Sequence, residues 1–335
     1  MKFSNHNFIA RANDLLSFDV TNLKKEGKYL VLADKTKDGV IESPIIETKE
    51  FIKLVGSWSA ITNPESTIEL FISVRINNSW SKYFTYGAWG LGGENLYYNQ
   101  DDQDVHMDVD EIIAKGDNLA NGFRFKVVLK KDAKLSLICI ALKIPNYTYP
   151  VDASNLPSYV CYDIPCLNQN MVPVIGGEMC SATTSTMLLN YKGFSFKDKD
   201  SEFEHRYIAG LVADNGHHAP TYGNWVFNTA VISAFGVDSY VARQYSWEEL
   251  KLHLATVGPV GASIKGDTGL YKTGGHLIVV RGYREENGKT YVICNDPNIN
   301  GRFGNDKDGK PLFVYYEFPL EVFNAFHRGV IYVIE

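Results

Sequence analysis

Residues 176–187 read GGEMCSATTSTM, and this stretch decides how the second half of the chain folds. Two loop glycines come first, and Cys180 then opens a run in which Thr184, Met187 and Tyr191 recur at helical spacing. The spacing predicts a helix whose first turn carries the thiol. Unpaired backbone N–H groups and the helix dipole stabilise negative charge at that end of a helix. Cys180 is therefore the candidate nucleophile.

The other cysteines fit such a role less well. Cys139 and Cys294 lie inside apolar strand patterns, where a free cysteine usually acts as a small hydrophobe. Cys161 and Cys166 lie close together in a region without periodicity, and they could pair in an oxidising compartment. A total of 5 cysteines in a long chain is not typical of a disulfide framework.

A histidine and an acid follow downstream of the thiol. His276 begins a continuous apolar strand and is the candidate general base. Asp296 follows a strand predicted at 290–294 and could accept a hydrogen bond from the imidazole. Asn295 could do the same, but neighbouring side chains on an extended segment point opposite ways, so only one can serve. We favour Asp296 and keep Asn295 as the alternative.

A fourth candidate, Gln169, lies in the segment before Cys180. A side-chain amide at this place could donate a hydrogen bond to the oxyanion of a tetrahedral intermediate. The backbone N–H of Cys180 would be the second donor. Gln169 is therefore the candidate oxyanion donor.

The sequence predicts no metal and no cofactor. It contains no metalloprotease zinc motif, paired Cys-x-x-Cys or phosphate-binding glycine loop. The acidic stretch 101–110 reads DDQDVHMDVD. Apolar and polar residues alternate in its second half, and Asp110 is on the polar side. This favours a strand with a solvated face over a calcium site.

Length and composition limit the possible partners and compartment. The chain has 335 residues, about two domains' worth, and no apolar run approaches the roughly 18 residues of a membrane span. The net charge of −6 argues against nucleic acid or an anionic membrane as the partner. The N-terminal residues lack the apolar run of a signal peptide. We therefore expect a cytoplasmic protein, and export by a non-classical route stays open.

The first part of the chain is predicted to be β-structure. Residues 68–76 alternate between apolar and polar side chains, as in a half-buried strand. Further strands are predicted at 80–86, 123–129 and 135–142, with turn residues between them. Short strands in this arrangement are typical of a β-sandwich, which we assign to residues 1–145.

The second part is predicted to mix helices and strands. Prolines punctuate a linker at 146–160, and the second domain covers 161–335. Helices are predicted at 225–235 and 246–256, the latter opened by a Ser–Glu capping box. Strands are predicted at 260–265, 277–282, 290–294, 313–318 and 330–334. The nucleophile on a helix and the base on an antiparallel sheet give an α+β fold.

At these residues the chain resembles papain-like cysteine peptidases related to the domain that trims double-glycine leaders from bacteriocins. Within that group it is similar to bacterial two-domain members with an N-terminal β-sandwich. The blocks that carry the likeness are IPCLNQ ending at Gln169, GGEMCS ending at Ser181, YGNW at 222–225, GPV at 258–260, GGHLIVVRG at 274–282 and NDP at 295–297. The segments FIKLVGSW at 51–58 and YGAW at 86–89 similarly resemble the sandwich of those proteins.

The resemblance implies a role for each candidate residue. Cys180 is the nucleophile, His276 the general base and acid, Asp296 the orienting acid and Gln169 the oxyanion donor. The chain departs from the pattern where many relatives have Gly-Pro after the nucleophile, because it has Ser-Ala. It also lacks the membrane span of the transporter-fused relatives. The resemblance therefore implies the chemistry rather than leader-peptide export.

The sequence thus predicts a cysteine peptidase that hydrolyses peptide or amide bonds of a peptide or protein substrate through a thioester. One alternative is an acyltransferase or amidase that uses the same thioester. The other is a non-catalytic protein whose N-terminal domain binds a glycan or a protein. Trp58, Trp80 and Trp89 could form a glycan-stacking surface, although core aromatics are the interpretation we favour.

Overall fold

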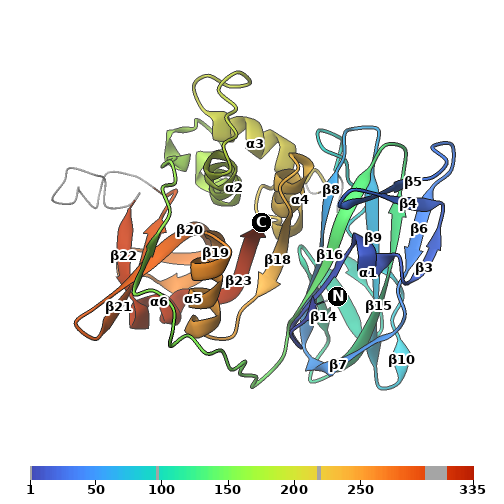
Figure 1. Cartoon of the computed structure of the whole chain (residues 1–335), viewed down its shortest axis with the longest axis horizontal. Helices are drawn as coiled ribbons and strands as arrows, with labels where there is room; N and C mark the ends of the chain where they lie inside the picture. The colour runs from blue at the N-terminus through green and yellow to red at the C-terminus, as the bar shows by residue number, and fades with distance from the viewer. Residues whose placement is uncertain (1, 96–97, 217–219, 299–314) are drawn as a thin grey trace. The chain divides into compact units, whose positions relative to one another are not determined.

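The computed structural model describes residues 2–95, 98–216, 220–298 and 315–335, which form two compact units (Figure 1). The first unit contains Met1–Tyr147 together with Ala213–Arg243. The second contains Thr148–Val212 and Gln244–Glu335. The predicted α+β class, with a sheet-rich first part, is confirmed. The assignment of residues 1–145 and 161–335 to two domains joined by a linker at 146–160 stays a prediction.

Two antiparallel sheets build the first unit (Figure 1). One contains, in spatial order, β1 (Lys2–Phe3), β2 (Asn7–Arg11), β16 (Lys134–Lys143), β8 (Lys53–Ile61), β14 (Glu111–Ala114), β13 (Val105–Asp108) and β12 (Gln100–Asp101), with β5 (Tyr29–Leu32) on β16 and β4 (Leu23–Glu26) on β5. The other contains β10 (Ser79–Trp80), β9 (Ile68–Ile76), β15 (Ala120–Leu129), β6 (Gly39–Glu42) and β3 (Asp19–Thr21), with β11 (Phe84–Thr85) on β9 and β7 (Ile46–Phe51) on β15. A short helix, α1 (Ala12–Leu15), follows β2.

Aromatic side chains form much of the core of the first unit. Phe8 of β2 meets Phe123 of β15 edge to face, with ring centroids 5.6 Å apart. Trp58 and Trp89 are fully buried, and their rings lie 6.2 Å apart. Both are core residues, as we favoured, and neither can stack on a glycan at the surface. Trp80 is partly exposed, with the guanidinium of Arg124 4.7 Å from its ring centroid.

The clearest alternations of the first part are confirmed as strands. The predictions at 68–76, 123–129 and 135–142 correspond to β9, β15 and β16. The aromatic stretch 80–86 is not one strand, because it breaks into β10 and β11. Between these two short strands the backbone N–H of Lys82 donates to the carboxylate of Asp102 at 2.7 Å instead of to a neighbouring strand.

The acidic stretch forms the predicted strand as β13, with Val105 and Met107 buried and Asp108 exposed, but Asp110 departs from the predicted solvated face. It is only 5% exposed, and its Oδ1 accepts hydrogen bonds from the N–H groups of Trp225 (2.6 Å) and Val226 (3.4 Å). These residues begin α4 (Trp225–Ala234), so the carboxylate caps a helix rather than facing water. The strand itself ends before this residue, since Val109 has a φ of 49°.

The segment with α4 and β18 (Ser239–Arg243) belongs to the first unit although it comes late in the sequence. Side chains of the first sheet bind the backbone of β18 along one edge, at Ser239 and Arg243. Ser59 Oγ accepts from the N–H of Ser239 (2.8 Å) and donates to its carbonyl (2.6 Å). The Asn7 amide likewise accepts from Arg243 N–H (2.9 Å) and donates to its carbonyl (2.7 Å). These side chains take the place of a neighbouring strand.

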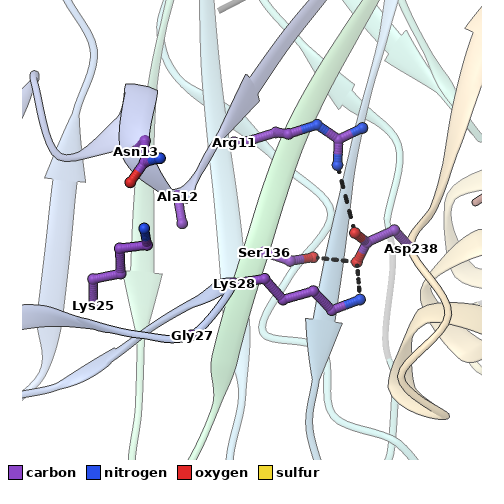
Figure 2. A pocket seen from close by; sticks show the side chains of 8 residues that line it. All are labelled: Arg11, Ala12, Asn13, Lys25, Gly27, Lys28, Ser136 and Asp238. Carbon is purple, nitrogen blue, oxygen red and sulfur yellow. Dashed lines mark hydrogen bonds and ion pairs between the residues drawn. The ribbon is translucent and has the colours of Figure 1, made fainter.

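A charged cluster secures the residues just before β18. Figure 2 shows Arg11, Lys28 and Ser136 converging on Asp238, at 3.5, 3.1 and 2.7 Å. They line a cavity of about 370 Å³. Because Asp238 is buried, the two cations and the hydroxyl supply the hydrogen bonds that its carboxylate would otherwise lack.

The second unit contains one antiparallel sheet with helices packed on it (Figure 1). Within the unit the strands run in the order β23 (His327–Ile334), β19 (Val260–Asp267), β20 (Lys272–Glu286), β21 (Lys289–Asn295) and β22 (Tyr316–Pro319), with β17 (Tyr159–Cys161) on β20. The helices are α2 (Cys180–Tyr191), which packs on β20 and β19, α3 (Glu204–Val212), which packs on α2, α5 (Trp247–Thr256) and α6 (Leu320–Phe326).

Most predicted elements of the second part are present. The helices predicted at 225–235 and 246–256 are α4 and α5, and Ser246 caps the latter by accepting from Glu249 N–H at 3.1 Å. The strand predicted at 313–318 is β22, and residues 313 and 314 lie outside the described residues. In the part of the chain that the structure describes, no helix is long and apolar enough to cross a membrane.

Candidate active site

Helix α2 positions the thiol. Cys180 is its first residue and is partly exposed, and the N-cap residue Met179 provides no side-chain cap. The backbone N–H groups of Ser181 and Leu277 donate to the sulfur. One turn further on, Thr184 Oγ1 donates to the carbonyl of Leu277 at 3.1 Å. Since Leu277 follows His276 on β20, this bond fixes the helix beside the imidazole.

His276 and Asp296 lie on neighbouring segments of the sheet. The ring Nε2 of His276 donates to Asp296 Oδ1 at 2.8 Å, and both side chains are buried. Cys180 is hydrogen-bonded to the same imidazole. Because Nε2 is directed at Asp296, the ring nitrogen available to the thiol is Nδ1. The structure thus brings Cys180, His276 and Asp296 together in one row.

The charges of this row change the pKa values of its members. Burial, the largest influence, opposes charge on both the thiol and the imidazole. The positive charge of His276 and its hydrogen bond nevertheless lower the pKa of Cys180. The negative charges of Asp296 and Cys180 raise the pKa of His276 to about 10. A thiolate and an imidazolium therefore stabilise one another near neutral pH.

The carboxylate of Asp296 is held from several directions. Its Oδ1 also accepts from the backbone N–H of Asn298 at 2.8 Å. Its Oδ2 accepts from the hydroxyl of Tyr271. Tyr271 was not predicted from the sequence, where it stands in a polar turn without any motif. Only the folded β19–β20 turn brings it to this carboxylate.

Asn295, the alternative to Asp296, points elsewhere. Its Nδ2 donates to the carbonyl of Ile164 at 3.1 Å, and its Oδ1 accepts from Arg281 at 3.2 Å. Both contacts lie away from His276. In this structure Asp296 is the one that meets the imidazole.

Gln169 is buried in a short 3₁₀ turn, Gln169–Met171, and closes the loop that leads to Cys180. Its Nε2 donates to the carbonyl of Gly176 at 2.8 Å, and its backbone N–H donates to Pro297 at 2.9 Å. Its Oε1 is buried and has no hydrogen-bond partner among the described residues. The loop before the thiol is thus bound to the segment that follows Asp296.

Two further features of this loop were not predicted. Gly176 has no room for a side chain, because a Cβ there would lie 2.4 Å from the carbonyl oxygen of Gln169. The adjacent His205 of α3 is buried, and its Nε2 lies 3.1 Å from the carbonyl oxygen of Asn168. The block IPCLNQ contains Asn168 and Gln169, but the block gives no sign of a histidine from another helix.

Comparison with known proteins gives the class of this site. The sequence model of the Peptidase_C39 like family matches residues 161–315, and the model of the Peptidase C39 N-terminal domain matches residues 21–138. The chain therefore combines a Peptidase_C39-like domain with a C39-type N-terminal domain, and the resemblance found in the sequence is confirmed. These matches support a cysteine peptidase in general.

Other comparisons add little. Among solved structures, the C-terminal CBM6 of LamC, a marine laminarinase from Zobellia galactanivorans, is 10% identical over 40% of this chain and 98% of that chain. The TM-score of 0.24 is too low for an argument about fold or function. No curated protein matches the chain.

Proposed function

We propose that the chain is a cysteine peptidase that hydrolyses peptide or amide bonds through a thioester on Cys180. The observation that supports this proposal is the row of hydrogen-bonded side chains, thiol to imidazole to carboxylate, at the start of a buried helix. Nucleophile, base and orienting group in such a row are the general requirement of this chemistry.

In the first half of the reaction the Cys180 thiolate attacks the carbonyl carbon of the scissile bond. The carbonyl π electrons move to oxygen and form a tetrahedral oxyanion. When the intermediate collapses, the C–N bond breaks and the His276 imidazolium gives its proton to the leaving amine. The products of this half are a thioester on Cys180, a free amine and a neutral imidazole.

In the second half, neutral His276 removes a proton from water, and the resulting hydroxide attacks the thioester. The C–S bond breaks, the carboxylic acid leaves, and the thiolate–imidazolium pair is restored. Asp296 stays ionised throughout and keeps the imidazole in one tautomer and orientation. No electron is gained or lost in either half.

The oxyanion needs hydrogen-bond donors at the start of α2. The backbone N–H of Cys180 is one candidate. The Gln169 amide nitrogen is the other, because it carries two hydrogens and the carbonyl of Gly176 takes only one. Donors of this kind lower the barrier by stabilising charge that develops in the transition state. We expect Gln169→Ala to lower kcat about a hundredfold.

The test is cleavage of a proteome-derived peptide library by the full chain, followed by mass spectrometry. We expect cleavage by wild type and none by Cys180→Ala, with Cys166→Ala as an active control because that thiol is exposed. Rapid quenching should show the acyl half of a substrate on Cys180. Cleavage that persists in Cys180→Ala would contradict the proposal.

Addition of an amine to the same reaction separates hydrolysis from acyl transfer. A thioester that reacts mainly with water gives free acid, whereas an acyltransferase gives mainly the amide of the added amine. We expect free acid to dominate.

A further inference from the structure

We propose that Tyr271 is a positioning residue of the catalytic row, which holds Asp296 in the orientation that His276 requires. This inference rests on the proposed function and extends it by a residue outside the thiol, imidazole and carboxylate. Its basis is a hydrogen bond from the Tyr271 hydroxyl to Asp296 Oδ2, on the oxygen that His276 does not use.

The turn that carries Tyr271 is built to aim the phenol. β19 ends at Asp267 and β20 begins at Lys272, so residues 268–271 form a tight turn between them. The buried Thr268 hydroxyl accepts from the N–H of Tyr271 (3.1 Å) and donates to its carbonyl (2.9 Å). The backbone N–H of Thr268 also donates to the carbonyl of Tyr271 at 3.0 Å. The turn therefore fixes the Tyr271 backbone independently of the catalytic groups.

The phenol ring also packs against the imidazole and restricts its position. The ring of Tyr271 lies edge-on to that of His276, with centroids 5.9 Å apart and an interplanar angle of 84°. Burial and the negative charge of Asp296 raise the pKa of Tyr271, so its hydroxyl stays protonated and acts as a donor. One side chain thus contacts the carboxylate by hydrogen bond and the base by its ring.

The consequence for catalysis follows from the burial of Asp296, which is 3% exposed. Without the phenol, Oδ2 would be a buried oxygen without its donor, and such an atom costs free energy. The carboxylate can regain a partner by rotating or by binding a proton. Either change weakens the Oδ1 bond to His276 and destabilises the imidazolium, so less thiolate forms at low pH.

The test compares Tyr271→Phe with Tyr283→Phe in the full chain. Tyr283 is a matched control because it lies on the following strand β20, is buried, and donates its hydroxyl to a backbone carbonyl, that of Pro157. The readout is the rate of Cys180 alkylation by iodoacetamide. We expect Tyr271→Phe to slow alkylation at pH 5 about tenfold, the loss expected for one hydrogen bond to a charged group. At pH 9.5 the rate should be unchanged, because the thiol ionises there without help.

A double variant shows whether Tyr271 acts through Asp296. Adding Tyr271→Phe to Asp296→Asn should slow alkylation no further than Asp296→Asn alone, since Tyr271 acts through the carboxylate that Asp296→Asn replaces. Alkylation of Tyr271→Phe at the wild-type rate at pH 5 would overturn the inference about Tyr271. An equal loss of alkylation rate at pH 5 and pH 9.5 would do the same. Neither result would contradict the proposed function. Absence of the low-pH reactivity in wild type would instead overturn the proposed function and, with it, this inference.

Discussion

At the scale of single residues, two neighbouring residues with similar side chains make different contacts. Asp296 meets the imidazole, whereas Asn295 binds Ile164 and Arg281 on the other side of the strand. The alternation of side chains along an extended segment separates them, as expected from the sequence. The sequence could not say which of them faces His276, because that depends on the register between β20 and β21.

Substitution of these two residues should therefore have opposite effects. We expect Asp296→Asn to lower kcat at least about a hundredfold, because the imidazole loses its orienting charge. Asn295→Ala should instead lower the free energy of unfolding by about 1–3 kcal/mol, since it leaves buried partners unsatisfied. Steady-state kinetics and urea unfolding measure the two effects. Equal kinetic losses in both variants would contradict these roles.

The pH dependence of hydrolysis follows from the same row. Both thiolate and imidazolium are needed, and the pKa of Cys180 is lowered while that of His276 is raised to about 10. We expect kcat/KM to rise on the acid side of the ordinary thiol range and to fall only near pH 10, where His276 loses the proton for the leaving amine. Rates from pH 4 to 11 measure both limbs. A fall on the alkaline side near pH 6.5 would contradict the ion pair.

Protonation of His276 also makes the stability of the fold depend on pH. The pKa of His276 is higher in the folded state than its ordinary value of 6.5. Its stabilising contribution is therefore complete below pH 6.5 and is lost as the pH rises through about 10. The difference in unfolding free energy between wild type and His276→Ala, measured by urea unfolding across this range, should become smaller as the pH rises.

At the scale of elements, local sequence patterns predicted the secondary structure well, whereas contacts between distant residues could not be predicted. The alternation in β9 and the cap of α5 are properties of a few adjacent residues, and both are present. The helices α3 and α6 were not predicted from the sequence. The thiol and imidazole could be predicted from their loop and strand contexts. Tyr271 could not, because its contact with Asp296 joins two separate turns.

The loop before α2 provides a test at this scale. Gly176→Ala places a Cβ against the carbonyl oxygen of Gln169, so the loop must shift and the Gln169 amide with it. We expect a loss of about 1–3 kcal/mol in unfolding free energy and a lower kcat. Gly177→Ala is the matched control, because a Cβ there has nothing within 4 Å. Chemical denaturation and kinetics on both variants are the measurement, and equal behaviour of the two alanines would contradict the role of this close approach.

At the scale of the whole molecule, sequence and structure divide the chain differently. The Peptidase_C39 like match covers 161–315 without interruption, yet residues Ala213–Arg243 within it pack in the first unit. This could not be predicted from the sequence, because the patterns of α4 and β18 are like those of any helix and strand of the second part. Their partners are side chains such as Ser59 and Asn7, far away in the sequence.

The charged cluster should hold this segment in place. Asp238→Asn removes the charge that Arg11 and Lys28 share, so we expect amide hydrogen exchange of residues 239–243 to speed up about fivefold, equivalent to about 1 kcal/mol. Asp132→Asn is the control, since Asp132 forms an exposed pair with Lys35. Exchange is measured by mass spectrometry on the full chain. Unchanged protection in Asp238→Asn would show that the cluster contributes nothing to this segment.

Alkylation of Cys180 by iodoacetamide from pH 4 to 9, in wild type and His276→Ala, tests the thiolate–imidazolium pair directly. The adduct is located by peptide mass mapping. We expect high reactivity near pH 5 in wild type and its loss in the histidine variant, because the imidazolium stabilises the thiolate. Reactivity that rises only near pH 8.5 and is the same in both proteins would contradict a thiolate–imidazolium pair and, with it, the proposed peptidase chemistry.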